Sequence, residues 1–267
     1  MFYRFPKRFM TTKRILLVCV AAVTTLLLPA RTSDDRTGLL KEAWLMGLEY
    51  QVKAGFNIGG TSPLPLPREI RRINSYSPTI AMSLEGDVHK TFGTSPWGLT
   101  IGMRFETKGM KTNASVKNYH MEMTADDGGY MQGAWTGNVR TKVRMSYITI
   151  PILATFQAAP RCRIYAGPYL SYATDSEFSG SAYDGYIRHG DPTGEKAYIE
   201  RATYDFSDDT RDFNVGLQVG GEWAAYKHFR LYADLNWGIN SIFPKNFESI
   251  TFEMYPIYAN IGFAYVF

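Results

Sequence analysis

The chain has 267 residues, with 29 lysines and arginines against 25 aspartates and glutamates, and a net charge of +4. The first 30 residues carry five of the basic residues and no acidic one, which leaves 24 basic against 25 acidic residues and a net charge of −1 for the remainder. This balance excludes the basic footprint of nucleic-acid binding proteins, so no nucleic-acid partner is expected.

The amino terminus has the pattern of a signal peptide. Five basic residues precede an uncharged run from Ile15 to Leu28, which Pro29 and Ala30 close. The run is shorter than the ~20 apolar residues of a transmembrane helix. We expect a signal peptide at 1–30, with Met1 or Met10 as its start, a short segment at 31–46, and a folded domain at 47–267. Only Cys162 remains after cleavage, so no internal disulfide is expected.

Eight segments alternate between apolar and polar residues, which is the period of a strand with two different faces. They lie at 47–59, 78–90, 97–110, 142–157, 163–174, 211–224, 229–241 and 257–267. In the sixth, every odd position from Phe213 to Val219 is apolar and every even one is Asn, Gly or Gln. The eighth places one apolar row at the end of the chain, made of Ile257, Ala259, Ile261, Phe263, Tyr265 and Phe267.

The fourth segment is the least regular. Its large apolar residues change parity around Pro151, since Val143, Met145 and Tyr147 are followed by Ile148, Ile150 and Ile152. A β-bulge at the proline is expected to restore the register.

The connections alternate in length. About 20, 30, 35 and 14 residues follow the odd-numbered strands and about half a dozen or fewer follow the even ones, as in outer-membrane barrels. We therefore predict an all-β fold, with an outer-membrane β-barrel domain at 47–267. It is an eight-stranded antiparallel transmembrane β-barrel with short periplasmic turns and long extracellular loops. The alternative is a soluble lipocalin-like barrel or β-sandwich, in which the apolar face would point inward.

Charged residues of both signs occupy the polar faces of these strands. The lumen of an eight-stranded barrel is just filled by side chains, so they predict an internal ion-pair network that plugs the barrel. A proton or ion path is the alternative. The candidates are Glu49, Lys53, Glu85, Asp87, Arg104, Glu106, Lys108, Arg144, Asp212, Glu222 and Asp234.

The two longest loops, 111–140 and 175–210, are rich in aromatic residues, whereas solvated disordered loops are usually poor in them. We expect these loops to pack on each other above the barrel or to bind a protein partner. The aromatic residues are Tyr119, Tyr130, Trp135, Tyr183, Tyr186, Tyr198 and Tyr204.

No spacing indicates an enzyme. His120 and His189 lie in long loops and could meet serines or aspartates there, but no triad is singled out. The aspartates at 205, 208, 209 and 212 could hold calcium, although they lack the spacing of a calcium loop. We expect no catalytic residue, no cofactor and no metal. A lipid-modifying enzyme of the outer leaflet and a narrow porin or secretion component are the alternatives.

Four local runs carry a family resemblance: G-M-R-F-E-T-K-G-M-K (102–111), Y-I-T-I-P-I-L (147–153), A-G-P-Y-L-S-Y (166–172) and I-G-F-A-Y-V-F (261–267). With the strand set, they resemble the PorT-like outer-membrane β-barrels of Bacteroidetes over 48–267. The resemblance implies a small barrel of the OmpX or OmpA type in the cell outer membrane, in contact with its lipid and lipopolysaccharide. It also implies that the terminal Phe267 is the residue that barrel-assembly machinery reads.

Overall fold

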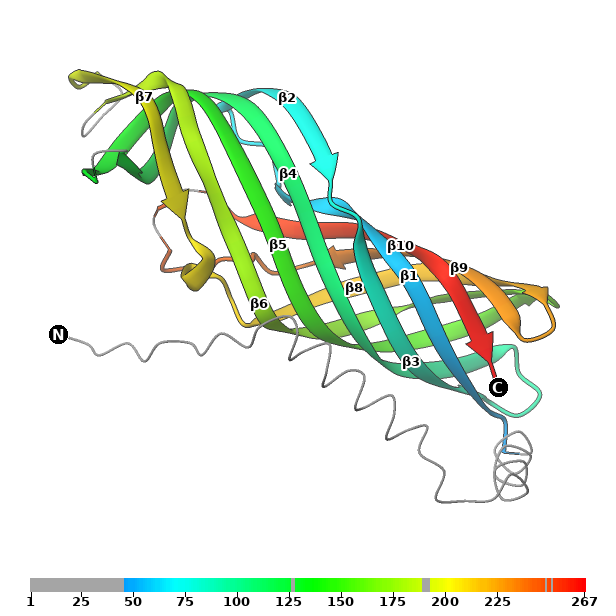
Figure 1. The fold of residues 1–267 in the computed structure, drawn as a ribbon. Coiled ribbons are helices and arrows are strands. Elements are labelled where there is room, and N and C mark those ends of the chain that lie inside the picture. Colours follow the sequence, from blue (N-terminus) through cyan, green and yellow to red (C-terminus); the bar gives the residue numbers. More distant parts are fainter. Residues whose placement is uncertain (1–45, 126–127, 189–192, 248, 251) are drawn as a thin grey trace, which may run out of the picture. The chain divides into compact units, whose positions relative to one another are not determined.

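A computed structural model describes residues 46–125, 128–188, 193–247, 249–250 and 252–267 (Figure 1). Residues Gly47–Phe267 form one compact unit. The predicted signal peptide lies outside the described residues, as does the segment that follows it except for Met46. The elements described are β1 (Leu48–Pro63), β2 (Ile70–Pro78), β3 (Ala81–Thr91), β4 (Trp97–Ala125), β5 (Tyr130–Ala159), β6 (Cys162–Arg188), β7 (Lys196–Asp205), the 3-10 helix η1 (Ser207–Asp209), β8 (Phe213–Tyr226), β9 (Phe229–Gly238) and β10 (Met254–Val266).

Eight of these strands close an antiparallel ring, in the order β1, β3, β4, β5, β6, β8, β9, β10 and back to β1. The closing pair of strands runs from Gln51 opposite Val266 to Pro63 opposite Met254. Each ring strand contains or overlaps one of the eight predicted segments. The predicted fold class, an eight-stranded antiparallel barrel, is therefore confirmed.

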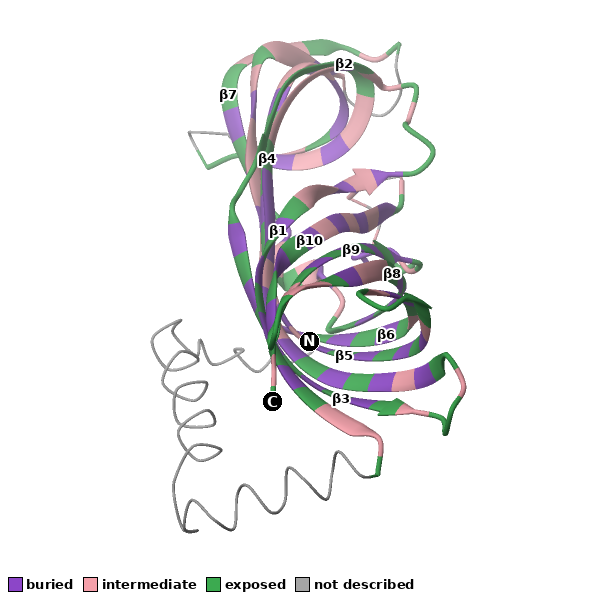
Figure 2. Cartoon of the chain, turned by 90° about the vertical axis from the view of Figure 1, so that its right-hand side faces the viewer, coloured by how far each residue is buried: buried purple, intermediate pink, exposed green. Residues whose placement is uncertain are grey.

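The two faces of the ring differ as the alternation predicts. Figure 2 shows the strands banded by burial, with buried and exposed residues in turn. Large apolar residues form the outer surface: Leu217 is 52% exposed, Leu235 47% and Ile261 52%. Their neighbours Gln218, Asn236 and Asn260 are buried inside. This is the arrangement of a barrel in lipid, not of a soluble barrel, which would bury its apolar face. Among the described residues, no helix has the length and apolarity to cross a bilayer.

The segments predicted as long loops are mostly strand. β4, β5 and β6 continue well beyond the barrel, and β7 joins β6 to β4 through the pairing of Thr124 with Thr203. The resulting second, smaller ring of β4, β5, β6 and β7 lies at the end of the molecule where β2 pairs with β4 (Figures 1 and 2). We call this part, made of β2, β7 and residues 111–125, 128–146 and 175–188, the extension. Most described residues of the predicted loops 111–140 and 175–210 are therefore strand, which the sequence did not predict, and the expected packing of the two segments on each other is confirmed.

The pattern of the long strands inverts where the extension begins. Inside the barrel β5 turns Thr149 inward, whereas Ile150 and Ile152 are exposed on the outer surface. In the extension it turns apolar Val143 and Met145 inward, at 1% and 2% exposure. The predicted bulge at Pro151 is wrong, because the pairing of β5 with β6 shifts instead between Ser146 and Tyr147. The parity of β5 never changes there; the chemistry of its inner face does.

Candidate functional site

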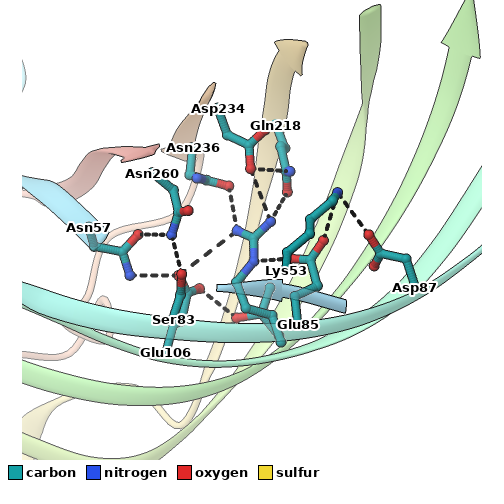
Figure 3. A network of polar contacts seen from close by, with 12 residues as sticks. Lys53, Asn57, Ser83, Glu85, Asp87, Glu106, Gln218, Asp234, Asn236 and Asn260 are labelled. Carbon is teal, nitrogen blue, oxygen red and sulfur yellow. Dashed lines mark hydrogen bonds and ion pairs between the residues drawn. The ribbon is translucent and has the colours of Figure 1, made fainter. Parts of the chain in front are cut away.

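The middle of the barrel is filled by a buried network of charged side chains (Figure 3). Lys53 Nζ lies 3.2 Å from Glu85 Oε1 and 2.8 Å from Asp87 Oδ2. The Arg104 guanidinium binds Glu85 as well and reaches Asp234 Oδ2 at 3.3 Å. Arg104 stands on β4 and Asp234 on β9, which lie opposite each other in the ring. The contact between them therefore spans the lumen.

Neutral amides complete this network. Arg104 donates from Nη1 to Asn236 Oδ1 and from Nη2 to Gln218 Oε1, both at 3.2 Å. Asn260 Nδ2 donates to Asn57 Oδ1 at 2.7 Å. Sequence reasoning singled out the charged residues and missed these amides as members of the site. They lie on the same polar faces of their strands as the charged residues, and this shared parity could have predicted that they point into the lumen.

A second layer surrounds Lys108. Its Nζ lies 2.9 Å from Glu106 Oε1 and 5.4–5.8 Å from the ring centroids of Tyr147, Tyr169 and Tyr258. A cation over aromatic faces is attracted by their quadrupoles, more so when it is desolvated. The cage joins β4 to β5, β6 and β10, so it also crosses the lumen.

A third group of charged side chains lies near the short turns. Glu49 accepts hydrogen bonds from Arg163 at 2.8 Å and from Arg230 at 2.7 and 2.8 Å. Glu222 Oε1 accepts from the same two arginines at 2.9 and 3.2 Å. At this end of the lumen, each of the two carboxylates therefore binds both guanidinium groups.

Two predicted lumen charges lie elsewhere. Arg144 is exposed, because β5 at that point belongs to the extension and turns its polar residues outward. Asp212 is also exposed, because it precedes the first residue of β8. The other nine predicted charges take part in the three groups described above.

The loop residues considered for chemistry do not converge. His120 lies on β4, with Nε2 3.4 Å from Gln132 Nε2, and no hydrogen bond joins it to a serine or carboxylate among the described residues. His189 lies outside the described residues. Around η1, Asp205 accepts hydrogen bonds from Ser207. Within the described ranges no three His, Cys, Asp or Glu side chains are placed to hold a metal, the four aspartates included.

The far end of the extension carries a compact aromatic and basic cluster. The rings of Tyr186 and Tyr198 meet edge to face at 5.8 Å, and Tyr198 is 78% exposed. Lys196 Nζ and the Arg188 guanidinium lie over the Tyr186 ring at 4.7 and 5.5 Å. We call these four residues the tip cluster; all of them fall in the segment 175–210 that was predicted to contact a partner.

An apolar pocket of about 320 Å³ lies between the upper end of β1 and the extension, and β2 forms part of its wall. Its lining includes Ile70, Ile73, Met110, Met121 and Met254, with a few polar groups such as the Thr61 hydroxyl. The volume is at the lower end of the range for small-molecule sites. No pattern in the sequence predicts this pocket, since its walls come from seven separate segments between Gly60 and Ile257.

An apolar outer band, a closed ring of eight strands and a polar interior together define a small transmembrane β-barrel of the outer-membrane type. Residues 34–244 match the family described as outer membrane protein beta-barrel domain, and the chain belongs to that family. Its location is accordingly the outer membrane.

Solved structures similar to this chain include Ail, the attachment invasion locus protein of Yersinia pestis, in complex with the heparin analogue sucrose octasulfate. That comparison has 8% sequence identity and a TM-score of 0.34, and covers 82% of this chain and 97% of Ail. A further Ail structure gives 9% identity and a TM-score of 0.33 over the same shares. Neisserial surface protein A gives 11% and 0.27, covering 83% of this chain and 97% of its own. No curated protein sequence matches the chain.

Proposed function

We propose that this outer-membrane barrel is a non-enzymatic scaffold that presents a partner-binding surface, the tip cluster, above the membrane. The single observation that carries the proposal is the exposed Tyr198, which packs on the half-buried Tyr186 beside Arg188 and Lys196 on an internally paired sheet. Tyrosine and arginine are the residue types enriched in binding hot spots. The two cations favour a partner that presents acidic groups.

The filled lumen supports a role other than conduction. Arg104 contacts residues of β3, β8 and β9, and Lys108 stands among tyrosines of three further strands. A permeating solute would have to break these buried contacts. We infer that the lumen is plugged by these side chains and that the barrel is not a porin.

The absence of enzymatic activity is part of the same proposal. The described surroundings of His120 offer Gln132 as its neighbour and no nucleophile or carboxylate bonded to it. An acid–base pair of the kind needed for lipid or peptide hydrolysis requires such a contact.

We also propose that a cleaved signal at residues 1–30 directs export, and that the chain is related more closely to the PorT-like barrels. The basic and then apolar run of the amino terminus supports the first, and the runs 102–111 and 166–172 support the second. The apolar row that ends at Phe267 supports recognition by barrel-assembly machinery.

The test is a photoreactive amino acid placed at Tyr198 in the protein in its native outer membrane. We expect a discrete adduct of higher mass on illumination, and its loss when Arg188 and Lys196 are both replaced by alanine. The same probe at Lys111, which is exposed on the wall of the extension, is the matched control and should give no such adduct.

Two outcomes would contradict the proposal. Equal adducts from positions 198 and 111 would show collisional labelling rather than a binding surface. Escape of a small dye from vesicles that carry the purified protein would show that the lumen conducts.

A further inference from the structure

A seam separates β1 from β2 at the upper rim of the barrel. β1 pairs with β3 from Leu48 to Asn57, and β2 pairs with β4, so above Asn57 the edges of β1 and β2 face each other without a ladder of backbone pairs. The Tyr76 hydroxyl bridges the seam by donating to the Gly59 carbonyl at 2.6 Å. The apolar pocket lies behind the seam, because residues 60–63 and β2 both line it.

The pocket borders the lipid-facing surface at Ile257. Ile257 lines it and belongs to the outer row of β10 that continues with Ile261 and Phe263, which are 52% and 57% exposed. Large apolar side chains also stand exposed on the barrel rim next to the seam, with Ile80 at 76% and Met82 at 70%. The pocket therefore opens where the apolar band ends, and acyl chains are the groups that surround such a band.

Three arginines and one acidic residue, Glu69, flank the pocket-lining isoleucines of β2 in sequence. Arg71 and Arg72 lie between Ile70 and Ile73, the two isoleucines of β2 that line the pocket, and Arg68 stands just before the strand. All three arginines are exposed, and none forms an ion pair with a described residue. An anionic group next to the pocket would give them a partner, since guanidinium binds phosphate in a bidentate geometry.

We propose that the apolar pocket takes an acyl chain of an anionic lipid from the outer leaflet, with the lipid phosphate at Arg71 and Arg72. Its walls suit such an occupant, because Met110, Met121 and Met254 are flexible and adapt to irregular apolar shapes. This site is separate from the tip cluster, so the lipid proposal does not depend on the partner proposed there.

Lipids with a photoreactive diazirine in the acyl chain provide the test. The protein is folded into phosphatidylcholine vesicles that contain diazirine-labelled phosphatidylglycerol, labelled phosphatidylcholine or a labelled free fatty acid. After illumination, mass spectrometry locates the labelled residues. We expect the phosphatidylglycerol probe to label Met121 and Phe206, which line the pocket at 1% and 6% exposure, and also the lipid-facing Phe263.

Two variants close the pocket. Ala114→Phe fills it from a wall position, and Gly60→Val narrows its mouth, where a Cβ would meet Met110 Sδ at 2.9 Å, the far part of a flexible side chain. Each should reduce labelling of Met121 and Phe206 at least several-fold and leave labelling of Phe263 unchanged. The second variant keeps the test available if the larger side chain prevents folding.

The headgroup is tested with Arg71→Gln combined with Arg72→Gln. This variant should bring the labelling of Met121 by phosphatidylglycerol down to that by phosphatidylcholine, whereas Arg144→Gln, an exposed arginine elsewhere on the extension, should not. Labelling confined to Phe263 in the unaltered protein would overturn the proposal. Labelling of Met121 by the free acid alone would also overturn it, because the site would then take a soluble ligand rather than a membrane lipid.

Discussion

Replacement of Arg104 by methionine tests how much the lumen network stabilises the barrel. The Arg104 side chain is 1% exposed and lies among three carboxylates: it binds Glu85, reaches Asp234 at 3.3 Å and Glu106 at 3.9 Å. The two layers around it hold three cations and four carboxylates. Methionine keeps much of the volume but leaves two cations against four carboxylates. Removal of one member of a buried ion pair costs about 3–5 kcal/mol, because it leaves an uncompensated charge.

A surface pair gives the matched control. Lys142 Nζ lies 2.6 Å from Glu177 Oε1, but the two side chains are 46% and 35% exposed. Water and salt screen such a pair, so Lys142→Met should cost no more than about 1 kcal/mol. The measurement is the urea midpoint of unfolding in detergent micelles, followed by the gel mobility of unboiled samples.

A double variant isolates the ionic part of the effect. Arg104→Met together with Glu85→Gln removes one cation and one carboxylate, and should cost less than the sum of the two single changes by about 0.5–3 kcal/mol. The reasoning fails if Arg104→Met costs no more than Lys142→Met. It also fails if the double variant shows simple additivity.

Three further predictions concern other parts of the chain. Gly216→Val should lower the yield of folded barrel, measured by gel mobility without boiling, because a Cβ at 216 would lie 2.3 Å from the Tyr169 ring. Phe178→Ala, at a position 2% exposed in the extension, should cost about 3–5 kcal/mol and open the extension to protease while the barrel keeps its unboiled mobility. Phe267→Ala should slow assembly in cells but leave refolding in micelles unchanged; equal slowing in both would contradict recognition of the terminal residue.

The barrel could be predicted because lipid and lumen demand opposite chemistry on the two faces of each strand. In β8, Val215 and Leu217 face outward and Asn214 and Gln218 inward, as the alternation predicts. The lumen charges followed from the same parity. Which charges meet could not be predicted, since the contact of Arg104 with Asp234 joins residues 130 positions apart and depends on how the ring closes.

The extension was not predicted because its strands turn apolar residues inward, the opposite of the barrel strands. In β4 the inward residues change from charged, at Arg104 and Lys108, to apolar at Met110 and Met121. If every strand is assumed to have an apolar row that faces lipid, this change in the alternation indicates the end of a strand. Irregularities add to the difficulty: Asn118 has a φ of +54°, and the register shifts between Val116 and Tyr119.

The inversion itself indicates where the boundary between lipid and water falls on β4 and β5. On β4 it falls between Lys108 and Met110, and on β5 between Met145 and Thr149. These positions lie side by side, because Lys108 pairs with Met145 in the ladder between the two strands. An outward apolar row must end, and an inward one must begin, at the level where lipid gives way to water. The apolar pocket, whose lining includes Met110, starts at that same level, so a membrane lipid needs to move only a short distance to enter it.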